Sequence, residues 1–265
     1  MAAPNEINCK EMLRLIGMPD CPAIVDISID PDFAEDPFLI PRSFCHPHSD
    51  LGGLIARLDG HACIAACQLG IKLSQGLKSR LRGRGVDAQY LAGDMYGWRE
   101  MANAPRIPFA ALPASNMWVT RHRPKIDRIA CRWLIRRFVD GGAEFMFVSP
   151  DQVAGVAGRY NATPFDIPDV ALTRHGDLCR FDAMLDLFDL RTDALNRLSQ
   201  VIRAADTGSD DTPQAASLLA FSVGLSRINH DDHPQLDAAI PLYDALYRWA
   251  LDGAHEIHAS LLDPS

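Results

Sequence analysis

Short apolar segments alternate with helical segments in the first hundred residues, and this order limits the fold more than any other feature. The segments "AIVDISID" (23–30), "ACIAAC" (62–67) and "AQYLAGD" (88–94) have the apolar or alternating pattern of strands. Between the last two, "LSQGLKSRLRGRG" places a leucine at every fourth residue from Leu73 and ends at glycine, which predicts a helix. Strand, helix and strand in this order predict a parallel α/β sheet with crossover helices.

A proline-rich segment separates this region from the rest of the chain. "PRIPFAALPASN" (105–116) has three prolines and no clear periodicity, which is typical of a linker between domains. We place the boundary near residue 113, giving domains 1–113 and 114–265. Strands are predicted in "MWVT" and "EFMFV", so the second domain is expected to be mainly α-helical with a small sheet. Its predicted helices are 126–139, 181–190, 193–206, 213–227, 234–251 and 253–262.

Length and composition indicate a soluble globular protein. A chain of 265 residues suits two domains, and no apolar run approaches the roughly 18 residues of a transmembrane helix. Its first residues lack the apolar block of a secretory signal, so we expect a cytoplasmic protein without membrane contact. Seven cysteines, an odd number, favour free thiols over a disulfide framework.

Cys67 lies where an apolar segment ends and a helix is about to begin. Backbone N–H groups and the helix dipole favour an anion at such a point and lower the pKa of a thiol. Lys72 adds positive charge, Gly70 allows a tight turn, and Ser74 can donate a hydrogen bond. These features predict a nucleophile in an anion-binding loop, and the alternative is a buried packing residue. Cys63, within the strand, is expected to be structural.

The sequence around Cys67 also matches a family pattern. The matching segments are "VDISIDPDFAEDPFLIPRSFCHPH" and "CIAACQLGIKLSQGLKSRLRGRGVDAQYLAGDMYGWRE". Over about residues 15–102 the chain resembles a rhodanese-like domain, which implies a sulfurtransferase without a cofactor. The resemblance implies that Cys67 takes sulfane sulfur from a small donor, holds it as a persulfide and passes it to a thiol or other acceptor. The residues implied to hold the anion with Lys72 are Gln68, Leu69, Gly70, Ile71, Leu73 and Ser74.

The loop departs from the rhodanese pattern at two positions. Rhodanese loops often carry arginines where this chain has Gln68 and Lys72, and this loop is one residue longer before the serine. A lysine is a point charge without the bidentate fork of arginine, so these differences leave the identity of the sulfur donor open.

The segment "WVTRHRPKIDRIACRWLIRRFVD" carries a strong local charge. Seven Arg or Lys residues and one acid lie between Asn116 and Arg137, although the whole chain has a net charge of -8. Helical spacing predicts a basic ridge, and the alternative is a solvated face that balances the acidic remainder. The ridge would comprise Arg128, Arg132 and Arg136, continued by Arg121, Arg123 and Lys125.

The same helix is predicted to bury an acid. Asp127 shares the buried face with Ala130, Cys131, Leu134 and Phe138. A buried aspartate needs a cation or hydrogen-bond donors, so Asp127 should pair with an arginine or bind a metal.

Other acids and histidines extend the predicted metal site. Imidazole and carboxylates from several helices suit a divalent ion such as iron, zinc or manganese. We predict the ligands His175, Asp182, Asp206 and Asp127, with Cys179 near them. One alternative is a metal bound by Cys45 with His46 and His48. The segment "NHDDH" (229–233) could also supply ligands, although a polar turn is preferred for its histidines.

Several of these segments together resemble a second family. They are the "WVTR-x-RPKIDRIAC-x-WLI-x-RF" block, "PFD", "H-x-D-x-C-x-F" and "YDALYRW", over about residues 117–252. This part resembles the C-terminal domain of ChrB-type chromate-resistance proteins, which implies tolerance to chromate, a tetrahedral dianion. The combined hypothesis is a sulfurtransferase joined to a chromate-resistance domain.

Two other functions are kept as alternatives. One is a chromate-responsive regulator that binds DNA through Arg121 to Arg137, although the acidic chain and the lack of a helix-turn-helix partner argue against it. The other is a pair of binding modules with an oxyanion pocket between them, lined by Arg123 and Lys125.

Overall fold

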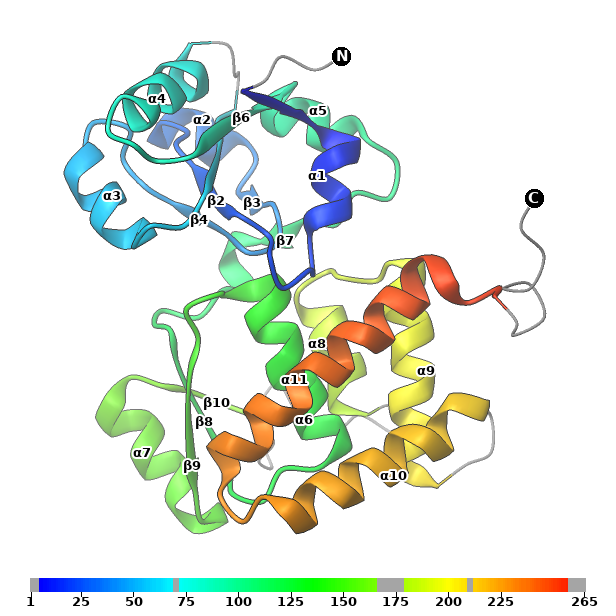
Figure 1. Ribbon diagram of the computed structural model, residues 1–265. Coiled ribbons are helices and arrows are strands. Elements are labelled where there is room, and N and C mark those ends of the chain that lie inside the picture. Colours follow the sequence, from blue (N-terminus) through cyan, green and yellow to red (C-terminus); the bar gives the residue numbers. More distant parts are fainter. Residues whose placement is uncertain (1–4, 69–71, 166–178, 209–211, 257–265) are drawn as a thin grey trace. The chain divides into compact units, whose positions relative to one another are not determined.

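The computed structural model describes residues 5–68, 72–165, 179–208 and 212–256 (Figure 1). Contacts within the chain define two units. The first comprises Met1–Pro113 with Ile135–Ala143, and the second comprises Ala114–Leu134 with Glu144–Ser265. Residues 135–143, which the sequence analysis assigned to the second domain, therefore group with the first unit.

A five-stranded parallel sheet forms the centre of the first unit, as the strand-helix-strand order predicts. Its strand order is β1-β6-β5-β2-β4, which places β5 in the middle with β2 and β6 on either side. The predicted strand 23–30 is shorter than expected, because the chain leaves the sheet after Asp26 and a helix begins at Asp30. The strands are β1 (Glu6–Asn8), β2 (Ala23–Asp26), β4 (Ser43–Cys45), β5 (Cys63–Ala66) and β6 (Ala88–Ala92).

Helices cover this sheet. Leu54 and Leu58 of α3, with Leu77 and Leu81 of α4, pack in one core cluster with Cys63 and other strand residues. Cys63 is thus a packing residue, and burial raises the pKa of its thiol to about 12. Helices α1 and α5 contact β6. The helices are α1 (Cys9–Leu15), α2 (Asp30–Glu35), α3 (Leu51–Leu58), α4 (Leu73–Arg82) and α5 (Asp94–Glu100).

The predicted linker contains regular structure. β7 (Ile107–Pro108) pairs antiparallel with β3 (Phe38–Leu39), and a 3-10 turn, Phe109–Ala111, follows. Proline tolerates an edge position of this kind, so the three prolines do not prevent the pairing. Residues 105–116 are therefore only partly a linker.

The second unit is mainly helical with a small sheet, as predicted. Three parallel strands have the order β10-β8-β9, and α7 contacts β8 and β10. Helix α6 contacts α8, α9, α10 and α11, and α9 also contacts α8, α10 and α11. Helix α10 contacts α11 as well. The elements are β8 (Met117–Arg121), α6 (Ile126–Leu134), β9 (Glu144–Val148), a 3-10 turn (Pro150–Gln152), α7 (Val153–Tyr160), β10 (Thr163–Pro164), α8 (Arg180–Leu187), α9 (Asp193–Thr207), α10 (Pro213–Ile228) and α11 (Asp232–Arg248).

Four of the six helices predicted for the second domain agree closely with α8 to α11. The predicted helix 126–139 is α6 followed by a π-helical turn, Ile135–Val139, and a second π-helical turn, Trp249–Gly253, follows α11. The predicted helix 253–262 is wrong for residues 254–256, which are not helical, and the rest of it lies outside the described residues. None of the helices in the described part of the chain is long and apolar enough to cross a bilayer.

Candidate functional site

Cys67 follows β5, where the carboxyl ends of the parallel strands meet at one edge of the sheet. Its thiol belongs to the core cluster that contains α3 and α4, and the residue is only 3% exposed. The backbone N–H of Cys67 donates to Oδ1 of Asp94 at 3.0 Å, and the N–H of Met95 donates to the carbonyl of Cys67 at 3.2 Å. The start of α5 therefore holds the end of β5 by two hydrogen bonds.

Asp94 is held in an uncommon backbone conformation beside Cys67. Its φ is 49°, and Gly93 before it has a φ of 83°, so two successive residues are left-handed. Burial raises the pKa of Asp94 to about 6, although hydrogen bonds from Cys67 and Ser74 favour the charged form. Asp94 therefore changes protonation close to neutral pH.

A second buried carboxylate ends β2. Asp26 is 3% exposed and pairs in register with Ala66, the residue before Cys67. Its Oδ1 accepts from the N–H and hydroxyl of Ser28, whereas Oδ2 has no hydrogen-bond partner in the described structure. Burial raises the pKa of Asp26, and its charge in turn raises that of Asp94. Two carboxylates thus lie around the end of β5.

The structure describes only part of the predicted anion loop. Gln68 and Ser74 are buried, Leu73 begins α4, and Lys72 is exposed just before the helix. The helix start predicted after Cys67 is therefore confirmed. Leu69, Gly70 and Ile71 lie outside the described residues, so their predicted role stays a prediction.

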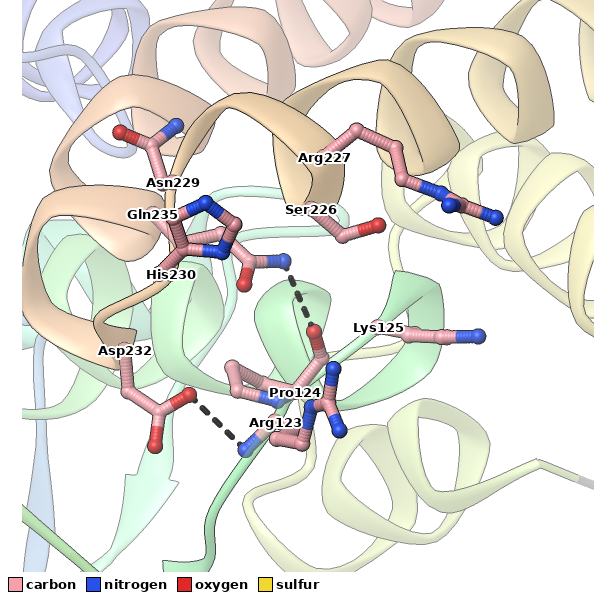
Figure 2. A pocket seen from close by; sticks show the side chains of 9 residues that line it. All are labelled: Arg123, Pro124, Lys125, Ser226, Arg227, Asn229, His230, Asp232 and Gln235. Atoms are coloured by element: carbon pink, nitrogen blue, oxygen red, sulfur yellow. Dashed lines mark hydrogen bonds between the residues drawn. The ribbon is translucent and has the colours of Figure 1, made fainter.

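A basic pocket of about 570 Å³ lies in the second unit (Figure 2). Two of its cations, Arg123 and Lys125, were predicted to bind an anion, and Arg227 of α10 is a third. In Figure 2 the side chains of Lys125 and Arg227 extend in the same direction from different segments. All lining residues belong to the second unit: Arg123, Pro124, Lys125, Ser226, Arg227, Asn229, His230, Asp232 and Gln235.

Helix α11 fixes the loop that presents the predicted cations. Oδ1 of Asp232 accepts from the backbone N–H of Arg123 at 2.8 Å, and Nε2 of Gln235 donates to the carbonyl of Pro124 at 2.9 Å (Figure 2). Gln235 is buried, and Arg123 has a positive φ of 56°. The guanidinium of Arg123 and the ammonium of Lys125 are left exposed on a fixed backbone.

The "NHDDH" segment joins α10 to α11. His230 lines the pocket, and the ring of His233 lies 4.7 Å from that of Phe147, edge to face. The polar connection is therefore limited to residues 229–231, because Asp232 and His233 already belong to α11.

The predicted basic ridge is wrong at its centre. Arg132 has 0% exposure, its guanidinium lies 4.5 Å from the centre of the Phe147 ring, and its Nη1 donates to the carbonyl of Arg128 at 3.1 Å. Burial on nearly all sides of α6 overrides the simple four-residue spacing. Arg121 ends β8 and does not line the pocket.

Asp127 is buried and paired, as one of its two predicted roles requires. It is 2% exposed, and its carboxylate accepts from the N–H groups of Arg180 and Phe181 at 3.2 and 2.9 Å. Nη1 of Arg180 lies 3.3 Å from Oδ2. The other residues predicted on this face, Ala130, Cys131, Leu134 and Phe138, are buried as well.

Asp182 stabilises the same start of α8. Its Oδ2 accepts from the N–H and thiol of Cys179, each at 3.2 Å, and its Oδ1 accepts from Arg191 at 3.1 Å. Nε of Arg203 lies 3.9 Å away. The carboxylate of Asp182 therefore already accepts hydrogen bonds from donors of the second unit.

The second unit is similar to known proteins. A family model described as "ChrB, C-terminal domain" matches residues 118–250. The chain belongs to this family. Protein ChrB of Cupriavidus metallidurans is 33% identical over 136 residues, which are 49% of this chain and 39% of that protein. The chain thus matches about two fifths of its relative's length, and no solved structure matches it.

The ChrB resemblance predicted from the sequence is thereby confirmed, and both the Asp127 pairings and the basic pocket lie within the ChrB C-terminal domain. The comparisons show no rhodanese domain in the first unit, so that resemblance stays a prediction.

The predicted metal site stays a prediction, because one of its four predicted ligands lies outside the described residues. No group of three or more His, Cys, Asp or Glu residues suited to a metal occurs among them. Asp206 is exposed on α9, and His175 lies outside the described residues. At the alternative site, Nε2 of His46 lies 2.7 Å from the carbonyl oxygen of Asp50.

Two residues of these sites, Asp94 and Arg227, were not predicted from the sequence. Asp94 follows a predicted strand in "LAGD", and an acid at the second residue after the end of a parallel strand is a signal that was available. Arg227 had no such signal, because it lies about a hundred residues from Arg123 and Lys125, and only the packing of α10 brings it to them.

Proposed function

We propose that this ChrB-family protein takes part in chromate resistance by binding a tetrahedral oxyanion in the basic pocket of its second unit. The observation that carries the proposal is that Arg123, Lys125 and Arg227 line one cavity. Charged donors bind oxyanions by charge-assisted hydrogen bonds, which are about twice as strong as neutral ones.

The loop before α6 favours such a ligand. Asp232 and Gln235 hold its backbone, so part of the ordering cost of binding is met before the anion arrives. The net charge of -8 makes a local cluster of three cations distinct from the rest of the surface. The ChrB family membership makes chromate the first oxyanion to test.

The pocket predicts a graded loss of chromate affinity. Arg123→Gln, Lys125→Gln and Arg227→Gln should each weaken binding about tenfold, because each removes one charged donor. Equilibrium dialysis followed by chromate absorbance measures the affinity. Arg159→Gln removes an exposed cation of the same unit outside the pocket and serves as the control.

Equal affinities for all four variants would contradict the pocket. Displacement of bound chromate by an equal concentration of sulfate would mean a general site for tetrahedral oxyanions. Salt-sensitive DNA binding that Arg123→Gln and Lys125→Gln abolish would instead favour the regulator.

We also propose that the first unit is a sulfurtransferase that acts through Cys67. The specific support is the position of Cys67 at the carboxyl end of β5, ahead of α4 and against the Asp94 carboxylate. Because the residue is 3% exposed, a donor reaches the sulfur only after a neighbouring group moves.

Persulfide formation tests this second function directly. The protein is incubated with thiosulfate or with glutathione persulfide, and its peptides are analysed by mass spectrometry. We expect the peptide of Cys67 to gain the mass of one sulfur atom. A gain confined to other cysteines would remove Cys67 as the acceptor.

A further inference from the structure

We propose that Asp94 takes the proton of the Cys67 thiol and later returns it to the departing thiol, and that the site uses a persulfide donor in preference to thiosulfate. This inference rests on the proposed sulfurtransferase function of the first unit. The observations behind both parts are the position of Asp94, at the start of α5, against Cys67 and the burial of its carboxylate.

Asp94 has the geometry of a proton acceptor for Cys67. Its Oδ1 accepts the backbone N–H of Cys67 at 3.0 Å, and the side chains of Cys67 and Ser74 hydrogen-bond to the same carboxylate. The left-handed backbone at Gly93 and Asp94 turns the start of α5 toward the cysteine. A general base must lie within hydrogen-bond reach of the proton that it takes, and Asp94 meets this condition.

The surroundings keep the carboxylate close to its titration point. Asp94 is 4% exposed, and within the described residues neither it nor Asp26 forms an ion pair with a lysine or arginine. Burial and the charge of Asp26 raise the pKa of Asp94 to about 6, so at neutral pH it is ionised and able to accept a proton. The titratable or hydrogen-bonding groups around it are Cys67, Ser74 of α4, Asp26 of β2, Cys9 of α1 and Tyr90 of β6.

The charge of the site bears on the donor. Thiosulfate is a dianion, and the carboxylate of Asp94, ionised at neutral pH and hydrogen-bonded to Cys67, opposes its approach. A persulfide, R–S–SH, brings less negative charge to the sulfur that is attacked. Lys72 is exposed just before α4 and supplies the one cation that the sequence places in this loop.

The proposed reaction balances in atoms, charge and protons. The Cys67 proton passes to Asp94, and the thiolate attacks the outer sulfur of R–S–SH, so a new S–S bond forms while the S–S bond of the donor breaks. The electron pair of the broken bond leaves with R–S⁻, which takes the proton from Asp94. The products are the Cys67 persulfide and the thiol R–SH, with no other reductant or oxidant.

Alkylation of Cys67 by iodoacetamide tests the proton acceptor without sulfur transfer. In the unmodified protein the rate at Cys67, followed by peptide mass spectrometry, should rise as the pH increases through about 6, where Asp94 loses its proton. Asp94→Asn keeps an acceptor for the Cys67 N–H and tolerates a positive φ, but it cannot take the proton. We expect it to lower the rate at neutral pH about a hundredfold.

A matched control separates the role of the carboxylate from its conformation. Asp59 also has a positive φ, 45°, but is exposed at the end of α3, so Asp59→Asn should leave alkylation unchanged. Burial raises the pKa of Asp94 from about 4 in the unfolded chain to about 6 in the folded protein. The free energy of unfolding therefore falls as the pH rises from about 4 to about 6. Asparagine carries no such charge, so Asp94→Asn should fold at neutral pH. Alkylation of Asp94→Asn as fast as in the unmodified protein would overturn the proposal.

Donor selection is measured by kcat/KM for sulfur transfer to cyanide. We expect a value at least about tenfold higher with glutathione persulfide than with thiosulfate, and a smaller ratio in Asp94→Asn, which has lost the negative charge beside Cys67. A higher value with thiosulfate would overturn the donor assignment. No transfer with either donor would remove the sulfurtransferase itself, whereas the alkylation profile tests Asp94 independently.

Discussion

Replacing Cys67 by serine is expected to lower sulfur transfer by at least about a thousandfold. Serine has nearly the same size, so the core cluster with α3 and α4 should stay packed. Its hydroxyl ionises far less readily than a thiol and forms no persulfide. The measurement is sulfur transfer from glutathione persulfide to cyanide by the intact protein and by Cys67→Ser.

The control for this prediction is Cys45→Ser. Cys45 ends the edge strand β4 of the same sheet and is exposed, so its loss should leave turnover unchanged. All seven cysteines lie in the described part of the chain and none of them forms a disulfide there, so neither substitution breaks one. Turnover retained in Cys67→Ser would contradict the proposed nucleophile and would leave Cys67 a packing residue.

Replacing Asp127 by alanine is expected to destabilise the protein by about 3–5 kcal/mol. The carboxylate is 2% exposed and accepts from the N–H groups of Arg180 and Phe181 as well as from the Arg180 guanidinium. Alanine leaves these donors without that acceptor at the start of α8. Because a domain is commonly stable by about 5–15 kcal/mol, the loss should be plain in urea unfolding of the full chain.

Asp127→Asn is the matched variant, since an amide oxygen still accepts from a backbone N–H. It should destabilise the protein less than Asp127→Ala. Burial raises the pKa of Asp127, so the ionised carboxylate costs stability as the pH rises above about 4, and the asparagine variant should lack this pH dependence. Equal losses for both variants would contradict the capping role.

Metal analysis of the same preparations tests the predicted iron, zinc or manganese site. A bound divalent ion in the unmodified protein that is lost in the folded Asp127→Asn variant would favour Asp127 as a ligand. Metal content unchanged by this substitution would remove Asp127 from the predicted set of ligands.

Several parts of the fold follow from local patterns in the sequence. The apolar segments, the leucine spacing from Leu73 and the glycine after it predicted β5, α4 and β6, because strands and helices differ in the period of their buried residues. The same reasoning predicted α6 with Asp127 on its buried face. The length of the first block in the second half was enough to indicate the ChrB family.

Which side chains these elements bring together depends on packing between segments that are distant in the sequence. Arg132 follows the spacing of an exposed ridge on α6, yet it is buried with its guanidinium against the ring of Phe147 in β9, so the burial of a charged residue depends on its neighbours. Arg227 meets Arg123 and Lys125 because α10 and α11 pack beside the loop before α6. Likewise Asp94 reaches Cys67 across 27 residues, because β5 and β6 are adjacent parallel strands whose carboxyl ends lie at the same edge of the sheet.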